Sequence, residues 1–158
     1  SNSALGIAMV AFENRDYENA KFQLETITSD FSGTAASDVA NFYLGKIYFE
    51  SEDFVKSELY LKTFLNTGDS KILYFGAIKM LANIALQNNE YDKAMKLLDS
   101  GLKKVSKNNS IELKILKTHV LKNKGNTNLA KEILEEVMLE KKLPRHLRQR
   151  SEELIGMM

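Results

Sequence analysis

Apolar residues recur three and four positions apart along most of the chain, and short polar segments interrupt them at regular intervals. This spacing is typical of amphipathic helices that bury one stripe of side chains. The pattern predicts helices over residues 3–14, 17–30, 35–51, 54–67, 70–88, 91–106, 110–124, 127–141 and 145–157. The only proline, Pro144, comes directly before the last range, where its fixed φ angle suits the start of a helix. We therefore expect an all-α protein.

One short pattern occurs four times. A small residue stands at positions 20, 57, 94 and 130, so consecutive copies are 37, 37 and 36 residues apart. Four residues after each small residue comes a leucine, namely Leu24, Leu61, Leu98 and Leu134. Self-similarity at such a period is the signature of a repeat architecture. Each repeat reads as two helices, in which the small residue lets the paired helices approach closely and the leucine fills the adjacent space.

A polar residue precedes the second helix of each repeat and is expected to cap it. These residues are Asp16, Asp53, Glu90 and Asn126. Asp and Asn are strong caps because their side-chain oxygens accept hydrogen bonds from unpaired backbone amides, whereas Glu90 is a weaker cap and Asn89 is a second candidate beside it. Turns between repeats are expected at Ser32-Gly33, Gly68-Asp69 and Asn108-Asn109.

Two-helix units at this period resemble the tetratricopeptide repeat, a helix-turn-helix of about 34 residues. The matching residues are Leu44-Gly45, Tyr48, Phe54, Ser57, Leu61 and Phe64 in the second repeat and Leu81-Ala82, Ala85, Tyr91, Ala94 and Leu98 in the third. The resemblance implies an all-α, right-handed α-solenoid of four helical hairpins in a single domain over residues 1–158. Its repeats would cover residues 1–34, 38–71, 75–108 and 111–144, followed by a capping helix over 145–157. The fourth repeat departs from the family pattern at Lys117 and Thr118, so its first helix is expected to sit differently.

Two further stretches are similar to bacterial envelope proteins that carry this repeat. The first is Phe31-Ser32-Gly33-Thr34-Ala35-Ala36-Ser37, and the second is the ending at residues 147–155, which is similar to the closing helix of an ancillary subunit of the Sec translocon. This resemblance implies a periplasmic domain of a membrane-anchored bacterial protein, with a cytoplasmic domain as the alternative. No apolar run in the chain approaches the roughly 20 residues of a membrane span. Membrane contact is therefore expected only through an anchor upstream of Ser1.

The resemblance also implies that the first helix of each repeat lines a concave groove. The groove residues that it implies are Leu5, Met9, Phe12, Phe42, Lys46, Phe49, Lys79, Asn83, Leu86, His119 and Lys122. The N-terminal half of this set is apolar and the C-terminal half is polar and basic. Apolar residues with a polar rim suit the binding of a peptide or helix, because burial gives affinity and the rim sets the register.

The resemblance thus implies a non-catalytic scaffold that binds a peptide or helix of a partner protein, with Lys46 among the lysines that attract acidic flanking residues. Two alternatives remain open. In the first, Phe12, Phe42 and Phe49 belong to the core, as aromatic stripes at helical spacing usually do, and line no groove. In the second, the apolar face of the N-terminal repeat binds a second copy of the chain and forms a homodimer.

Charge excludes one class of partner. The chain has 22 Lys and Arg residues against 21 Asp and Glu residues, a net charge of +1, which is too balanced for a dedicated nucleic-acid binder. The charge is nevertheless uneven, at −4 over residues 1–79 and +5 over residues 80–158. The densest basic stretch contains Lys141, Lys142, Arg145, His146, Arg148 and Arg150. This stretch could bind phosphates, anionic lipid head groups or an acidic partner. Alternatively, it is a solvated helix end with no ligand.

Catalytic and metal-binding residues are not expected. The chain has no cysteine, and its two histidines, His119 and His146, do not form a metal-ligand pair at helical spacing. No glycine motif that cradles phosphate is present either, so we expect no cofactor. Lys79 and Asn83 match the first half of the carboxylate clamp of co-chaperone repeats. Leu116 stands where that clamp needs an asparagine, which argues against an acidic-tail clamp.

Overall fold

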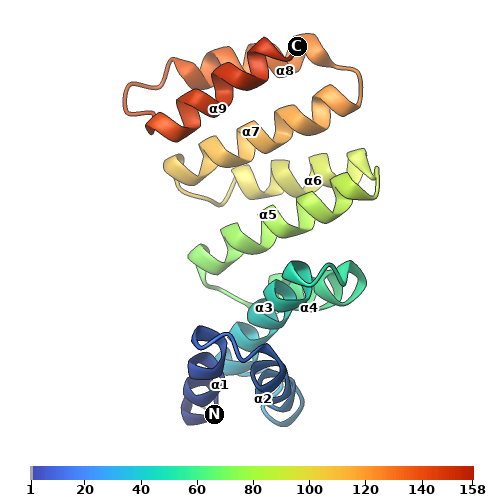
Figure 1. Cartoon of the computed structure of the whole chain (residues 1–158), viewed down its shortest axis with the longest axis vertical. Coiled ribbons are helices and arrows are strands. Elements are labelled where there is room, and N and C mark those ends of the chain that lie inside the picture. Colours follow the sequence, from blue (N-terminus) through green and yellow to red (C-terminus); the bar gives the residue numbers. More distant parts are fainter. Residues whose placement is uncertain (1) are drawn as a thin grey trace. The chain divides into compact units, whose positions relative to one another are not determined.

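The computed structural model describes residues 2–158, and helices make up most of this range (Figure 1). The helices are α1 (Asn2–Glu13), α2 (Tyr17–Asp30), α3 (Ala35–Glu50), α4 (Phe54–Thr67), α5 (Lys71–Gln87), α6 (Tyr91–Leu102), α7 (Lys107–Asn123), α8 (Thr127–Met138) and α9 (Arg145–Gly156). No strand occurs among residues 2–158, so the prediction of an all-α helical repeat is confirmed. Ser1, and with it the expected upstream anchor, lies outside the described residues.

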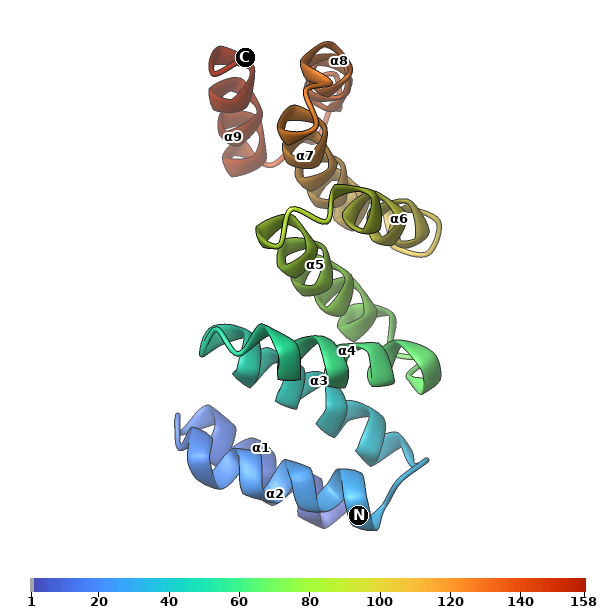
Figure 2. The ribbon, with the colours of Figure 1, turned by 90° about the vertical axis from the view of Figure 1, so that its right-hand side faces the viewer.

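The chain divides into two compact units, and the division falls within α5, after Met80. We call the part up to Met80 unit 1 and the part from Leu81 unit 2. In unit 1, α1 packs beside α2 and α3 beside α4, and α2 also contacts α3 (Figure 2). In unit 2, α7 contacts both α6 and α8, and α8 contacts α9. The single domain expected from the sequence, with its repeat boundaries, stays a prediction.

The repeated small residues lie where the paired helices touch. Ala20, Ser57, Ala94 and Ala130 are all 0% exposed, and so are the four leucines that follow them. In the hairpin of α3 and α4, the Ser57 hydroxyl donates a 2.7 Å hydrogen bond to the carbonyl oxygen of Gly45. A Cβ atom at Gly45 would lie 2.5 Å from the side chain of Leu61. The glycine therefore allows the close approach of α3 to α4, and serine replaces alanine without leaving a buried hydroxyl unsatisfied.

The turn between the two helices of a repeat has the same backbone conformation in all four copies. Arg15, Glu52, Asn89 and Gly125 have φ angles of 61°, 63°, 59° and 88°. The following residue donates its backbone N–H to a carbonyl oxygen at the end of the preceding helix, as in the 2.9 Å bond from Asp53 to Tyr48. This pattern is the Schellman motif, which usually places glycine at the left-handed position. Only the fourth copy has a glycine there, and the third has an asparagine, which tolerates this conformation better than most residues. Arg15 and Glu52 in the first two copies therefore carry the Cβ strain of the left-handed conformation.

Two of the expected N-caps are confirmed. A side-chain oxygen of Asp16 accepts a hydrogen bond from the backbone N–H of Asn19 at 3.3 Å, and Asp53 accepts one in the same way. Within residues 2–158, the side chain of Asn126 caps no backbone N–H, contrary to the prediction. Glu90 forms no such bond either, as its weaker capping tendency indicates. The first two hairpins therefore have the better-capped second helices.

The helix α7 begins three residues before its predicted start. The prediction of a turn at Asn108-Asn109 is wrong, because both residues lie in the first turn of α7. The Ser106 side chain accepts a 3.3 Å hydrogen bond from the backbone N–H of Asn109 and so caps the helix. Serine caps helices as well as asparagine does, and the turn accordingly moves to residues 103–106. The helix α6 therefore ends at Leu102 rather than at residue 106.

The fourth repeat satisfies its two unusual polar residues. The Lys117 ammonium lies 2.8 Å from a carboxylate oxygen of Asp99 on α6. Thr118 is 0% exposed, and its hydroxyl donates a 2.6 Å hydrogen bond to the carbonyl oxygen of Ile115. Lys117 and Thr118, which stand where the other repeats have an apolar and a small residue, are thus satisfied by a salt bridge and a local hydrogen bond. The helix α7 contacts both α6 and α8.

The last helix covers the apolar side of the hairpin formed by α7 and α8. Leu154 of α9 and Leu143 of the preceding loop join Ile111, Ile115, Leu134 and Val137 in one buried cluster. The charged residues Arg145, Glu152 and Glu153 of α9 remain exposed. A polar outer face is what a terminal helix needs in order to end a stack of repeats in water.

The left-handed turn positions give a stability prediction. Replacement of Glu52 by glycine should raise the free energy of unfolding by about 0.5–1 kcal/mol, because glycine adopts positive φ without Cβ strain. The reverse change at the equivalent position, Gly125→Ala, should lower it by about 1–2 kcal/mol. Urea denaturation followed by circular dichroism measures both effects. A destabilising Glu52→Gly change would show that this turn is not left-handed.

Candidate functional site

The predicted groove residues lie on the first helices of the repeats and fall into two groups. In unit 1 they are Leu5, Met9 and Phe12 on α1, Phe42, Lys46 and Phe49 on α3, and Lys79 on α5. In unit 2 they are Asn83 and Leu86 on α5 and His119 and Lys122 on α7. The unit 1 group is apolar apart from Lys46 and Lys79, and the unit 2 group is polar apart from Leu86.

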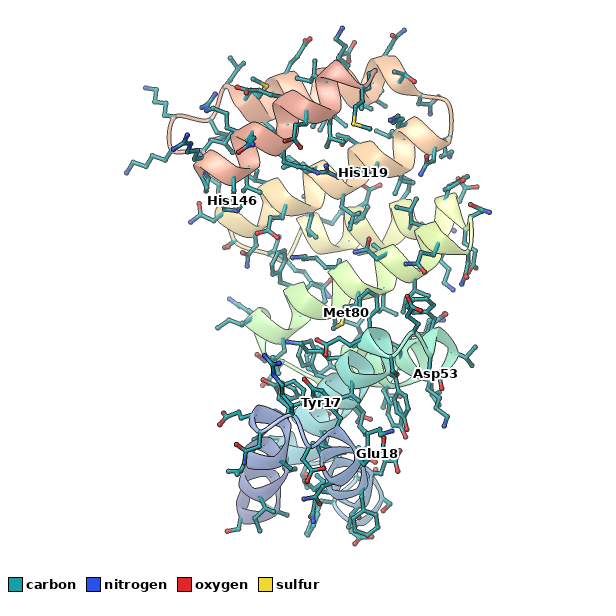
Figure 3. The ribbon with its side chains drawn as sticks, in the orientation of Figure 1. Tyr17, Glu18, Asp53, Met80, His119 and His146 are labelled. Carbon is teal, nitrogen blue, oxygen red and sulfur yellow. The ribbon has the colours of Figure 1, made fainter. Side chains whose placement is uncertain are left out.

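Aromatic rings of unit 1 form a continuous chain of edge-to-face contacts. The ring centroid of Phe12 lies 5.8 Å from that of Tyr17 and 5.1 Å from that of Tyr43. The ring of Phe42 continues the chain, at 5.2 Å from Tyr43 and 5.7 Å from Phe64. Edge-to-face pairs at these distances attract one another. We call these five residues the aromatic ladder, which joins α1, α2, α3 and α4; Tyr17 is labelled in Figure 3.

Phe42 belongs to the core of unit 1 and not to an open surface. Its side chain is 6% exposed. A Cβ atom at Gly76 would lie 3.1 Å from its ring, so the missing side chain of this glycine makes room for the phenyl group. The placement of Phe42 in the groove is therefore corrected, and the alternative of a core aromatic holds for this residue. Phe12 and Phe49 are only partly buried.

Partly buried side chains of α1 and α3 form a mixed apolar and basic surface. Leu5 and Phe12 pack against the core cluster of unit 1 but keep part of their surface in solvent, and Met9 lies between them on the same side of α1. The Lys46 ammonium lies 5.7 Å from the ring centroid of Phe12, within the range of a cation–π attraction. The ring of Phe49 instead lies 5.6 Å from that of Phe54 on α4. We call Leu5, Met9, Phe12 and Lys46 the α1–α3 face.

Lys79 makes the same kind of contact as Lys46. Its ammonium lies 4.9 Å from the ring centroid of Phe75, one turn earlier on α5. Each lysine therefore holds its ammonium group close to the face of an aromatic ring. This arrangement places positive charge next to apolar surface on unit 1.

In unit 2, His119 connects α7 to α9 (Figure 3). An Nη2 atom of Arg150 lies 3.2 Å from Nε2 of His119. A guanidinium group only donates hydrogen bonds, so the neutral His119 ring accepts through Nε2 and carries its proton on Nδ1. Burial lowers the pKa of His119 from its ordinary value of 6.5, and the charges of Arg150 and Lys122 lower this pKa further. His119 therefore serves as a neutral acceptor that helps to hold α9.

The described residues offer no metal site. Among residues 2–158, no group of three or more His, Asp or Glu side chains lies close enough together to hold a metal ion. The same range contains no helix with the length and apolar character that crossing a membrane requires.

An exposed apolar edge on the first hairpin was not assigned residue by residue from the sequence. Ile7 and Val10 are 58% and 57% exposed, and with Asn14 and Asp16 they line a hollow of about 310 Å³. Their equivalents one repeat later, at positions 44 and 47, are 0% and 5% exposed and belong to a core cluster with residues of α2. The offset of 37 residues could have revealed this edge, because it pairs each exposed residue with a buried one. We call Ile7 and Val10 with the hollow the N-terminal edge.

The chain is similar to one family of known proteins. The sequence model of a family described as a tetratricopeptide repeat-like domain matches residues 2–150. The match covers α1 to α8 and the first half of α9. A search of curated proteins finds no match. The bacterial envelope type and the cellular location stay predictions.

The contact of His119 with Arg150 gives a pH prediction. The unfolded chain binds the His119 proton at a higher pH than the folded chain does, because the folded-state pKa is lowered. Protonation thus favours unfolding, and the free energy of unfolding should fall as the pH drops below about 6.5. Urea denaturation at several pH values should show a smaller fall for His119→Gln. His146→Gln, which removes an exposed histidine, is the matched control and should leave the His119 contribution in place.

Proposed function

We propose, since the chain belongs to the tetratricopeptide repeat-like domain family, that it binds a peptide or helix of a partner protein on the α1–α3 face. The family match points to a protein–protein interaction module, and a repeat fold of this kind is typically a non-catalytic scaffold. The observation that carries the finer proposal is the combination of partly buried apolar side chains with a lysine held over the Phe12 ring.

The α1–α3 face suits an apolar partner segment. Leu5, Met9 and Phe12 are four and three residues apart, so they form one stripe along α1. A partner with apolar residues at helical spacing would bury the part of these side chains that still meets solvent. Methionine adapts its shape to different partners, and the aromatic ladder already fixes the ring of Phe12. Binding would therefore cost little side-chain entropy at the aromatic anchor.

Lys46, beside this stripe, favours an acidic flank in the partner. Lys46 and Lys79 hold their charges beside apolar rings of unit 1. Charges at the rim of an interface mainly raise the association rate and set the register, while the apolar centre provides most of the affinity.

A second candidate function is self-association through the N-terminal edge. Ile7 and Val10 occupy positions that the second repeat buries against a preceding helix. The occupant that we propose is a second copy of the chain, related by a two-fold axis. Head-to-tail stacking would need an equally open last hairpin, but α9 covers the apolar side of that hairpin with a charged outer surface. Two N-terminal edges can instead bury each other in an isologous contact.

Peptide selection tests the first proposal. A random peptide library selected on the protein should enrich apolar residues at helical spacing next to acidic residues. Met9→Glu should weaken the selected peptides at least about tenfold, because it places a charge among apolar contacts. Lys46→Glu should weaken them several-fold and reduce the salt dependence of binding, measured by fluorescence anisotropy. Lys62→Glu, at an exposed position on α4, is the control and should bind normally. Equal affinity for all variants would refute the α1–α3 face as the binding surface.

Sedimentation analysis tests the second candidate. The chain should form dimers at micromolar concentration, and the double change Ile7→Glu and Val10→Glu should make it a monomer. Both side chains are more than half exposed, so their replacement should leave the fold of unit 1 intact. Val55→Glu, at an even more exposed apolar position on α4, should not change the oligomeric state. A wild-type protein that stays monomeric over this range would eliminate self-association.

A further inference from the structure

Basic side chains gather at one end of unit 2, where α7 begins and α8 ends. Lys107 at the start of α7 and Lys141 and Lys142 after α8 line one hollow of about 570 Å³. Arg145, the first residue of α9, follows Lys142 by three positions and is exposed. We call these four residues the basic tip. Lys103 and Lys104, both exposed, precede Lys107 in the turn before α7 and extend the positive charge.

An exposed leucine lies within this basic surface. Leu139 lines the same hollow and is 82% exposed. The buried stripe of α8 consists of Ala130, Leu134 and Val137, so Leu139 lies outside it and contributes little to packing. Two acidic residues, Glu136 and Glu140, also line the hollow, and Glu140 lies 3.4 Å from the Lys107 ammonium. Positive charge still predominates around Leu139.

The basic stretch of the sequence thus contains two kinds of residue. Arg148 donates a 3.3 Å hydrogen bond to the carbonyl oxygen of Met138, and Arg150 contacts both His119 and, at 3.7 Å, Glu153. These arginines hold α9 in place. The lysines that follow α8 instead extend from the surface and are available to an external partner.

We propose that the basic tip docks the protein on the surface of an anionic lipid bilayer, with Leu139 inserted between the head groups. A lysine ammonium is a compact charge on a flexible chain, so several lysines can each meet a phosphate without a fixed geometry. The aliphatic part of each lysine can lie along the apolar boundary while its charge stays among the head groups. An exposed leucine at the centre adds the apolar contribution that charge alone lacks.

Other partners fit this surface less well. The segment from Leu139 to His146 contains no Phe, Tyr or Trp on which nucleic-acid bases could stack. Protein interfaces are depleted in lysine at their centres and enriched in aromatic residues and arginine. A lysine-rich tip with one leucine therefore matches a fluid anionic surface better than a folded partner. The basic tip belongs to unit 2 and would bind lipid, whereas the α1–α3 face belongs to unit 1 and would bind a peptide or helix.

Flotation with lipid vesicles tests the inference on the whole chain. The protein should bind vesicles in which about one third of the phosphatidylcholine is replaced by phosphatidylglycerol, and it should not bind pure phosphatidylcholine. A rise in salt from about 0.05 M to about 0.5 M should release it, because screening shortens the reach of the charges. Binding that is equal for neutral and anionic vesicles, or absent from both, would overturn the proposal.

Three variants separate the contributions. The pair Lys141→Glu and Lys142→Glu should lower vesicle binding by more than about tenfold, since each lysine near an anionic surface is worth about fivefold in affinity. Leu139→Ser should lower binding several-fold and leave its salt dependence intact, because it removes only apolar surface. The control pair Lys96→Glu and Lys131→Glu makes the same change in net charge at exposed positions on α6 and α8.

The control variants also define the contrary results. Circular dichroism should show the same helix content for all of them, since every altered side chain is exposed. An equal loss of binding in the control pair would mean that overall charge, and not the basic tip, is responsible. A third result would also contradict the proposal: the protein binds nucleic acid but not anionic vesicles, and the Lys141→Glu and Lys142→Glu pair abolishes that binding. The basic tip would then be a site for nucleic acid and not for lipid.

Discussion

The close approach of two helices at a small residue is the constraint on which the rest of the structure depends. Where Ala20, Ser57, Ala94 or Ala130 lies, no side chain separates the paired helices, and the following leucine is completely buried. Ser57 shows that the constraint is steric, because its hydroxyl is tolerated once it donates to the Gly45 carbonyl. This contact fixes the rotation of each helix about its axis. It thereby decides which side chains face the partner helix, which face the next repeat and which remain on the surface.

The same constraint explains why one edge of the first hairpin is apolar. In a repeat, the side that meets the preceding repeat is normally buried, so its residues are selected for packing. Positions 44 and 47 follow this rule, and Ile7 and Val10 carry the same chemistry without a preceding helix in the described chain. The last hairpin differs from the first, because α9 covers its apolar side and exposes charged residues to solvent. Within the described residues, the last hairpin is thus covered on its apolar side, whereas Ile7 and Val10 of the first hairpin are exposed.

Most of the local structure could be predicted from the sequence, because helical periodicity and the spacing of the repeats are local signals. The ranges 17–30 and 54–67 agree with α2 and α4 residue for residue. The turn before α7 could not be placed, since Ser106 and the Asn108-Asn109 pair are equally good capping signals. The left-handed residues Arg15 and Glu52 carry no such signal, because their turns close with Schellman hydrogen bonds although neither residue is the glycine that usually stands there.

The candidate site was harder to predict because burial depends on residues far apart in the sequence. Phe42 stands at a position that the repeat pattern assigns to the groove, but Gly76 leaves a space that its ring fills. The pairing of Lys117 with Asp99 likewise joins residues 18 positions apart on different helices, and neither residue alone reveals it. By contrast, the stripe of Leu5, Met9 and Phe12 along α1 follows from spacing alone, and its role in binding stays a prediction.

The basic stretch shows why charge in a sequence does not by itself define a surface. Arginine presents a planar fork of donors, which suits fixed acceptors such as the Met138 carbonyl and the His119 ring. Lysine gives up more side-chain freedom for each fixed contact, and Lys141 and Lys142 accordingly extend into solvent. Of the basic residues in this stretch, Arg148 and Arg150 therefore hold α9, whereas Lys141, Lys142 and Arg145 are exposed. Because the lysines belong to unit 2 and the α1–α3 face to unit 1, each surface can be altered without touching the contacts that build the other.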